Sequence, residues 1–140
     1  MTLPVLQPEL VAAFDAVADP LARTGLLHLR RLVFETAAEL PQIGHLQESL
    51  RWGQPAYLTP DTKAATTLRL GVPKTARFAL FVHCRTSLIS DFTAAFPGWD
   101  RVEGNRAVLF DDIAQVDPVR HGWLIRRALT YHLKGSKTLL

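Results

Sequence analysis

The residues from Arg77 to Cys84 alternate between two kinds of side chain, and this alternation constrains the fold more than any other feature of the sequence. One side of an extended chain carries Phe78, Leu80 and Val82, and the other carries Arg77, Ala79, Phe81 and His83. A period of two is typical of a β-strand. The segment therefore predicts a sheet with one apolar face and one mixed face.

A second strand is predicted just before this one. The threonine-rich segment from Ala64 to Gly71 also alternates, and the turn residues 71–74, Gly-Val-Pro-Lys, separate the two segments. Such a short link favours antiparallel pairing. A turn at 103–106 and a strand from Ala107 to Phe110 add to the same sheet.

The first 50 residues have helical spacing instead. A helix is expected over Glu9–Val17, because its apolar residues recur every three or four positions. Asp19 and Pro20 have the form of an N-cap and a first-turn proline, and the helix that follows runs to about Leu40. Residues 44–50 are expected to form a short third helix.

Two more helices follow in the second half. Thr86 or Ser87 caps a short one, and Asp117-Pro118 begins the last one, which Gly135 closes. The prediction is a single α+β domain over residues 1–140: a small antiparallel sheet, with the N-terminal helices and the C-terminal helix packed on one face.

The stretch WGQPAY, residues 52–57, separates the helical half from the sheet. Gly53 permits an unusual turn, and Pro55 fixes φ and ends helical structure. Trp52 and Tyr57 can bury ring area there while directing an N–H and an O–H at partners. We interpret this stretch first as a packing corner, which could also form the wall of a pocket.

The mixed face of the sheet is the strongest candidate for a binding site. Thr67 and Arg69 fall on the same side as Phe81 and His83. Such a face fits a ligand platform, and it also fits a half-covered surface with arginines that reach solvent. A guanidinium beside aromatic rings can hold a carboxylate or a phosphate. The predicted ligand-binding residues are Trp52, Tyr57, Arg69, Phe81, His83 and Arg106, for a small or anionic ligand or a protein partner.

Composition narrows the classes of partner. The chain has a net charge of +3, one cysteine and 48% hydrophobic residues. It lacks both a signal-like N-terminus and an apolar run long enough for a membrane, so we expect a cytoplasmic protein without membrane partners. Its basic residues are scattered and not interleaved with aromatic residues, which argues against nucleic acid.

Metal and catalytic motifs are sparse. The five histidines have no metal-ligand spacing, and Cys84 has no partner at a recognisable spacing. His83 and Cys84 are adjacent, so in a strand they would point to opposite faces. Asp111, Asp112, Asp117 and His121 could gather ligands, but Asp117 is better explained as an N-cap and the aspartate pair as a solvated loop. We therefore assign no catalytic residues and favour a non-enzymatic role, with an enzyme that uses His83 or Cys84 as an open alternative.

Five segments occur in a characteristic order between Glu48 and His132: ESLRWGQPAYL, KAATTLRLG, FALFVHCRTSL, RVEGNRAVLF and RRALTYH. They resemble the successive motifs of the YdhG-like family. The resemblance implies a compact α+β domain. It also offers an alternative function, since one branch of that family is described as frataxin-like iron chaperones for iron–sulfur cluster assembly. In this chain iron would have only Glu9, Asp15 and Asp19 in the first helical region.

Overall fold

Six strands form one antiparallel sheet in the order β1-β2-β3-β4-β6-β5. The strands are β1 (Gln47–Arg51), β2 (Gln54–Leu58), β3 (Leu68–Gly71), β4 (Phe78–Phe81), β5 (Arg101–Glu103) and β6 (Ala107–Phe110). The structure is a computed structural model that describes residues 2–133. The predicted α+β class is confirmed.

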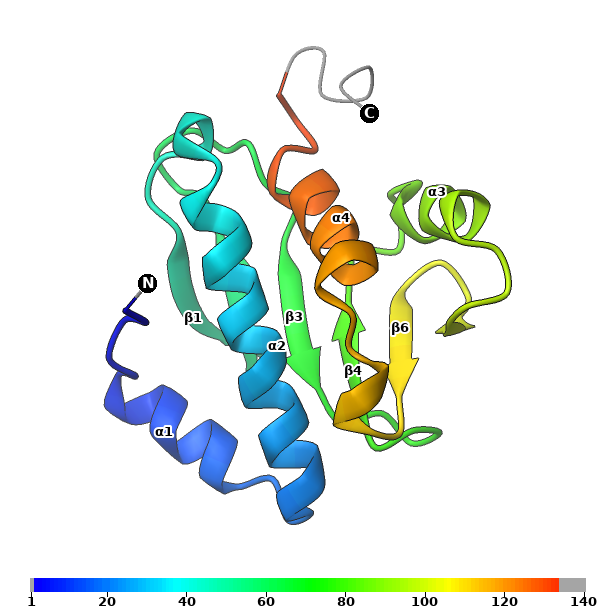
Figure 1. Ribbon diagram of the computed structural model, residues 1–140. Helices are drawn as coiled ribbons and strands as arrows, with labels where there is room; N and C mark the ends of the chain where they lie inside the picture. The colour runs from blue at the N-terminus through cyan, green and yellow to red at the C-terminus, as the bar shows by residue number, and fades with distance from the viewer. Residues whose placement is uncertain (1, 134–140) are drawn as a thin grey trace.

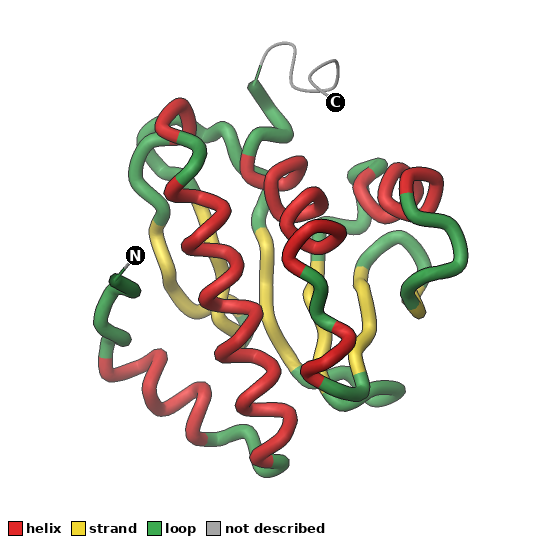
Figure 2. Tube along the Cα trace, in the orientation of Figure 1, coloured by secondary structure: helices red, strands yellow, loops and turns green. Residues whose placement is uncertain are grey.

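Four helices of the described chain lie on one side of this sheet (Figures 1 and 2). They are α1 (Pro8–Asp15), α2 (Pro20–Ala38), α3 (Leu88–Ala95) and α4 (Pro118–Leu129), with short 3-10 turns η1 (Pro41–Ile43) and η2 (Ile113–Gln115). Asp19 and Asp117 cap α2 and α4 through hydrogen bonds from the backbone N–H groups of Leu21 and Arg120, as their sequence context predicts. None of the helices within residues 2–133 is both long and apolar enough to cross a membrane.

The main core lies between the helices and the covered face of the sheet. The sheet contributes Tyr57, Leu68, Leu70, Phe78, Leu80, Val108 and Phe110, all nearly or fully buried. The ring of Phe78 stacks on that of Phe110, with centroids 5.1 Å apart. Gly25 of α2 lies directly over Phe78: a Cβ built on this glycine would come 2.4 Å from the ring. The glycine thus lets α2 approach the sheet closely.

The opposite face of the sheet carries a smaller cluster. Ala79, Phe81, Ala107 and Leu109 are buried there although all the helices of residues 2–133 lie on the other side (Figure 1). The alternation predicted along Arg77–Cys84 is confirmed for the strand itself, because Phe78 and Leu80 face the helices while Ala79 and Phe81 face away.

Four predicted elements differ from the structure. Residues 44–50 do not form a helix, since 47–51 are the edge strand β1. The strands predicted over 64–71 and 77–84 are shorter, because regular pairing covers only Leu68–Gly71 and Phe78–Phe81. The last helix ends at Leu129, and the predicted cap Gly135 lies outside the described residues.

Candidate functional site

The Trp-Gly corner is the turn of a β-hairpin. Arg51 pairs with Gln54, which leaves Trp52 and Gly53 as a two-residue loop between β1 and β2. Both loop residues have positive φ, +51° at Trp52 and +76° at Gly53, as a type I′ turn requires. The Trp52 side chain is 84% exposed. The predicted buried corner is therefore wrong for this residue.

Arg69 is the central side chain of the open face. It lies on β3 between two residues that face the helices, so its own side chain lies on the other side of the sheet. Its guanidinium carbon lies 5.2 Å from the Trp52 ring centre and 5.4 Å from that of Phe81. Its Nη1 donates a hydrogen bond to Gln54 Oε1 at 2.6 Å. Two rings and an amide oxygen thus hold the guanidinium in place.

A second arginine reaches the same ring from the turn before β6. The guanidinium carbon of Arg106 lies 5.9 Å from the Phe81 ring centre, and its Nε lies 3.4 Å from Glu103 Oε2. Burial lowers the pKa of Arg69, and the nearby charge of Arg106 lowers this pKa further. A guanidinium nevertheless stays charged at neutral pH. None of the ion pairs within residues 2–133 involves Arg69.

A cavity of about 360 Å³ opens beside these arginines. Its lining residues are Arg51, Trp52, Thr67, Arg69, Val82, His83, Cys84 and Arg106. His83 and Cys84 both line it, and neither lies in a regular strand, so the strand alternation expected for this pair does not apply to them. The reason is that β4 ends at Phe81, and the alternation of a strand does not continue beyond it.

The tautomer of the neutral His83 ring follows from its hydrogen bond. Its Nδ1 lies 3.1 Å from the backbone nitrogen of Arg85 and accepts the N–H there. In the neutral ring the proton is then on Nε2, which makes that atom a hydrogen-bond donor. The exposed thiol of Cys84 is the only thiol in the sequence.

The structure thus gathers four of the six predicted site residues around one cavity: Trp52, Arg69, His83 and Arg106. Phe81 is 5% exposed and lies beneath the two arginines, so it supports the cavity without forming its wall. Tyr57 lies on the other face of the sheet. Its hydroxyl donates to Glu48 Oε2 at 2.8 Å and its ring packs edge-on against Phe34. The expected place of Tyr57 in this pocket is therefore wrong.

Sequence reasoning missed Arg51 and Cys84 as wall residues and Gln54 as the partner of Arg69; Thr67 was placed on this face but not among the predicted ligand-binding residues. A signal for Arg51 and Gln54 was present, because a glycine in a two-residue link between alternating segments is typical of a hairpin. The position of Cys84 depends on where β4 ends, and nothing in its spacing marks that point.

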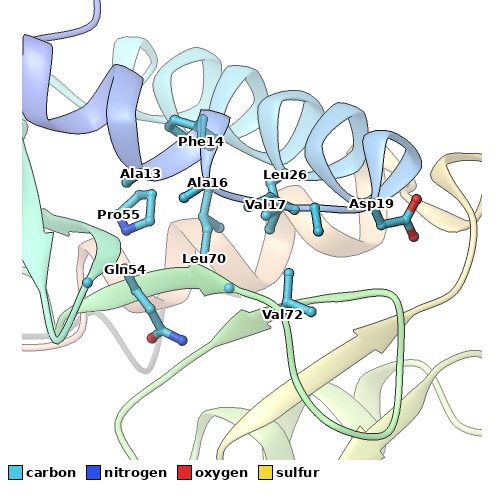
Figure 3. A pocket seen from close by; sticks show the side chains of 13 residues that line it. Ala13, Phe14, Ala16, Val17, Asp19, Leu26, Gln54, Pro55, Leu70 and Val72 are labelled. Atoms are coloured by element: carbon cyan, nitrogen blue, oxygen red, sulfur yellow. The ribbon is translucent and has the colours of Figure 1, made fainter.

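A second cavity, of about 410 Å³, lies on the helix side of the sheet (Figure 3). Ala13, Phe14 and Val17 approach it from α1 and the segment that follows, and Pro55 and Leu70 from the strands. In Figure 3 the Gln54 side chain points away from this cavity. Asp19, at one end, accepts a hydrogen bond from the backbone N–H of Leu21 and forms an ion pair with Arg77. The lining thus offers hydrocarbon surface but no free charged group, and we place the candidate site at the open face.

The residues considered for metal binding have structural roles. Asp112 and Asp117 cap η2 and α4. His121 is fully buried, with Nδ1 accepting from Asp117 N and Nε2 bonded to Asp100. Within residues 2–133, no group of three or more His, Cys, Asp or Glu side chains is placed to hold a metal ion.

Comparison of the chain with models of known protein families, with curated proteins and with solved structures found no match. The functional argument therefore rests on the geometry of this chain.

Proposed function

We propose that this protein is a non-enzymatic binding module that holds a small anionic ligand in the cavity on the open face of its sheet. The observation that carries the proposal is the environment of Arg69. Its guanidinium is held between the rings of Trp52 and Phe81, it makes no ion pair within residues 2–133, and a second arginine lies near it. Such an arginine can donate hydrogen bonds to the carboxylate or phosphate of a bound ligand.

The surrounding side chains support binding rather than catalysis. Thr67 and His83 add a hydroxyl and a ring N–H to the cavity wall. His83 Nδ1 is occupied by the backbone N–H of Arg85, so it is not the base that a nucleophilic Cys84 would need. Membership of the YdhG-like family is part of the same proposal and rests on the order of the sequence motifs between Glu48 and His132.

Cys84 provides the experiment, because it is the only cysteine and lines the cavity. The rate at which its thiol reacts with a neutral disulfide reagent, 4,4′-dithiodipyridine, reports whether the cavity is occupied. We expect inorganic phosphate or citrate to slow this reaction in a saturable way, while sodium chloride of equal ionic strength does not.

Arg69→Met should abolish the protection, because it keeps an apolar stem and removes the charge. Arg31→Met is the matched control: it removes one half-exposed arginine from α2, on the far side of the sheet, and should leave protection unchanged. The proposal is wrong if neither anion protects Cys84 in the wild type, or if the two variants behave alike.

A further inference from the structure

Trp52 is in an unusual place for a tryptophan. It lies at the tip of a hairpin with φ of +51°, where glycine, asparagine and aspartate are the usual residues. It is 84% exposed, and one face of its ring is turned to the Arg69 guanidinium at 5.2 Å. A strained conformation that presents a large ring to solvent, beside a cationic cavity, is a feature of a ligand contact.

Rings and cations alternate across the open face. Trp52, Arg69, Phe81 and Arg106 follow one another at distances of 5.2, 5.4 and 5.9 Å between guanidinium carbons and ring centres. Phe81 is 5% exposed and contacts both arginines, whereas the outer part of Trp52 remains open. A ligand in the cavity therefore has one aromatic surface available for stacking, immediately next to the charge of Arg69.

The charge around the cavity indicates how many negative charges the ligand carries. Three arginines line it, Arg51, Arg69 and Arg106, and only Arg106 has a nearby carboxylate, that of Glu103. Two positive charges thus remain without compensation among the described residues. A phosphate monoester, with a charge between −1.5 and −2 at neutral pH, matches this better than a single carboxylate.

We propose, building on the anion-binding function above, that the ligand is a phosphate monoester attached to a flat aromatic ring, as in a nucleoside monophosphate. Its phosphate binds Arg69, with the second uncompensated charge, that of Arg51, in the same cavity wall, and its ring stacks on the exposed surface of Trp52. A cavity of about 360 Å³ is within the size range of small-ligand sites. Gln54 acts as a positioning residue, because it holds Arg69 Nη1 through its Oε1 atom.

The test separates the ring from the phosphate. Wild-type protein is titrated with adenosine monophosphate, phenyl phosphate, benzoate, adenosine and inorganic phosphate, using protection of Cys84 as the readout. Stacking on an aromatic side chain should make adenosine monophosphate bind about tenfold or more tightly than inorganic phosphate. Phenyl phosphate should bind more tightly than benzoate, and adenosine should protect least.

Two tryptophan variants then identify the ring that stacks. Trp52→Leu should bring the ratio of the two affinities, adenosine monophosphate over inorganic phosphate, close to one, because only the first ligand has a ring to stack; this ratio is the readout, since Trp52 also packs on Arg69. Trp99→Leu is the matched control, since Trp99 is also exposed and also packs on an arginine, Arg120 at 4.7 Å, but lies outside this cavity. It should leave both affinities unchanged.

The outcomes separate this inference from the function on which it rests. If inorganic phosphate protects Cys84 as well as adenosine monophosphate does, the anion site stands and the aromatic ligand class is wrong. If benzoate equals phenyl phosphate, the preference for a doubly charged group is wrong. If no anion in the series protects Cys84, the anion-binding function itself fails.

Discussion

The guanidinium carbon of Arg69 lies 5.2 Å from the centre of the Trp52 ring, and this contact joins β3 to the turn between β1 and β2. The two residues differ in how strongly their surroundings fix them. Arg69 is fixed by Phe81 and Gln54, whereas Trp52 is 84% exposed. Stability and binding should therefore respond differently to changes at Trp52.

Trp52→Asn should leave the protein as stable as the wild type or stabilise it by up to about 1 kcal/mol. Asn-Gly is the preferred pair in a type I′ turn, and relief of the left-handed strain, about 1 kcal/mol, offsets the loss of an exposed cation–π contact of about 0.5–1 kcal/mol. Urea unfolding of both proteins measures the difference. A loss of 3 kcal/mol or more would mean that the indole is part of the core.

Tyr57 should behave in the opposite way, because it is fully buried. Tyr57→Phe removes the hydroxyl that donates to Glu48 Oε2 and should cost about 2 kcal/mol, since the acceptor is a charged group. Glu48 stays paired with Arg30, so the fold should survive.

The stability difference between the wild type and Tyr57→Phe should depend on pH. Burial is the main cause that raises the pKa of Tyr57 well above its usual value, and the charge of Glu48 and its hydrogen bond raise this pKa further. The stability that Tyr57 contributes is thus fully present below the unfolded-state pKa of about 10 and is lost as pH rises above it. The advantage of the wild type over Tyr57→Phe should be constant up to about pH 10 and should shrink as the pH rises from 10 toward 12. An unchanged difference across this range would contradict the assignment.

Two helical glycines give the sharpest packing prediction. In Gly25→Ala the new Cβ meets the buried Phe78 ring at 2.4 Å, so we expect a net loss of about 1–3 kcal/mol from overpacking. In Gly122→Ala on α4 the nearest atom is Thr36 Oγ1 at 3.9 Å, an ordinary contact. That variant should gain up to about 1 kcal/mol from helix propensity. Chemical denaturation of the two variants side by side checks both signs.

Local patterns predicted much of this fold. The apolar spacing and the caps at Asp19 and Asp117 place the long helices, and the alternation around Phe78 and Leu80 places the central strand. Glycine weakens helices, so local propensity gives no reason for Gly25 within α2. The structure supplies the compensating reason, which is close approach to Phe78, and this reason depends on packing between distant segments.

The residues of the candidate site could be predicted only where the alternation of a regular strand determines which face of the sheet a side chain occupies. Arg69 and Phe81 could be placed on one face because β3 and β4 are regular and pair residue to residue. Tyr57 could not, because its side depends on the register of β2 with β1 and β3, a long-range property. The exposure of Trp52 follows from a positive φ, which a tryptophan rarely adopts and which no propensity rule assigns to it.

Asp100 accepts two hydrogen bonds, from His121 Nε2 at 2.8 Å and from Arg120 Nε at 3.0 Å. His121 Nδ1 accepts the N–H of Asp117, so Nε2 carries the proton and donates to Asp100 even when the ring is neutral. This pair joins the loop before β5 to the start of α4. Asp100→Asn should therefore destabilise the protein by about 3 kcal/mol at pH 7, because it leaves buried donors without a charged acceptor.

The effect should depend on pH in a defined direction. Burial alone would raise the pKa of Asp100, but hydrogen bonds from His121 and Arg120, together with their charges, outweigh it and hold this pKa below its usual value. The stabilisation by the carboxylate is present above the unfolded-state pKa of about 3.9 and is lost as pH falls through the lower folded-state value. Unfolding free energies of wild type and Asp100→Asn should thus converge as the pH falls from 5 toward 2. Asp111→Asn is the matched control, since Asp111 makes an exposed pair with Arg101 and should cost less than about 1 kcal/mol. Equal losses in the two variants at pH 7 would show that the buried pair has no special role.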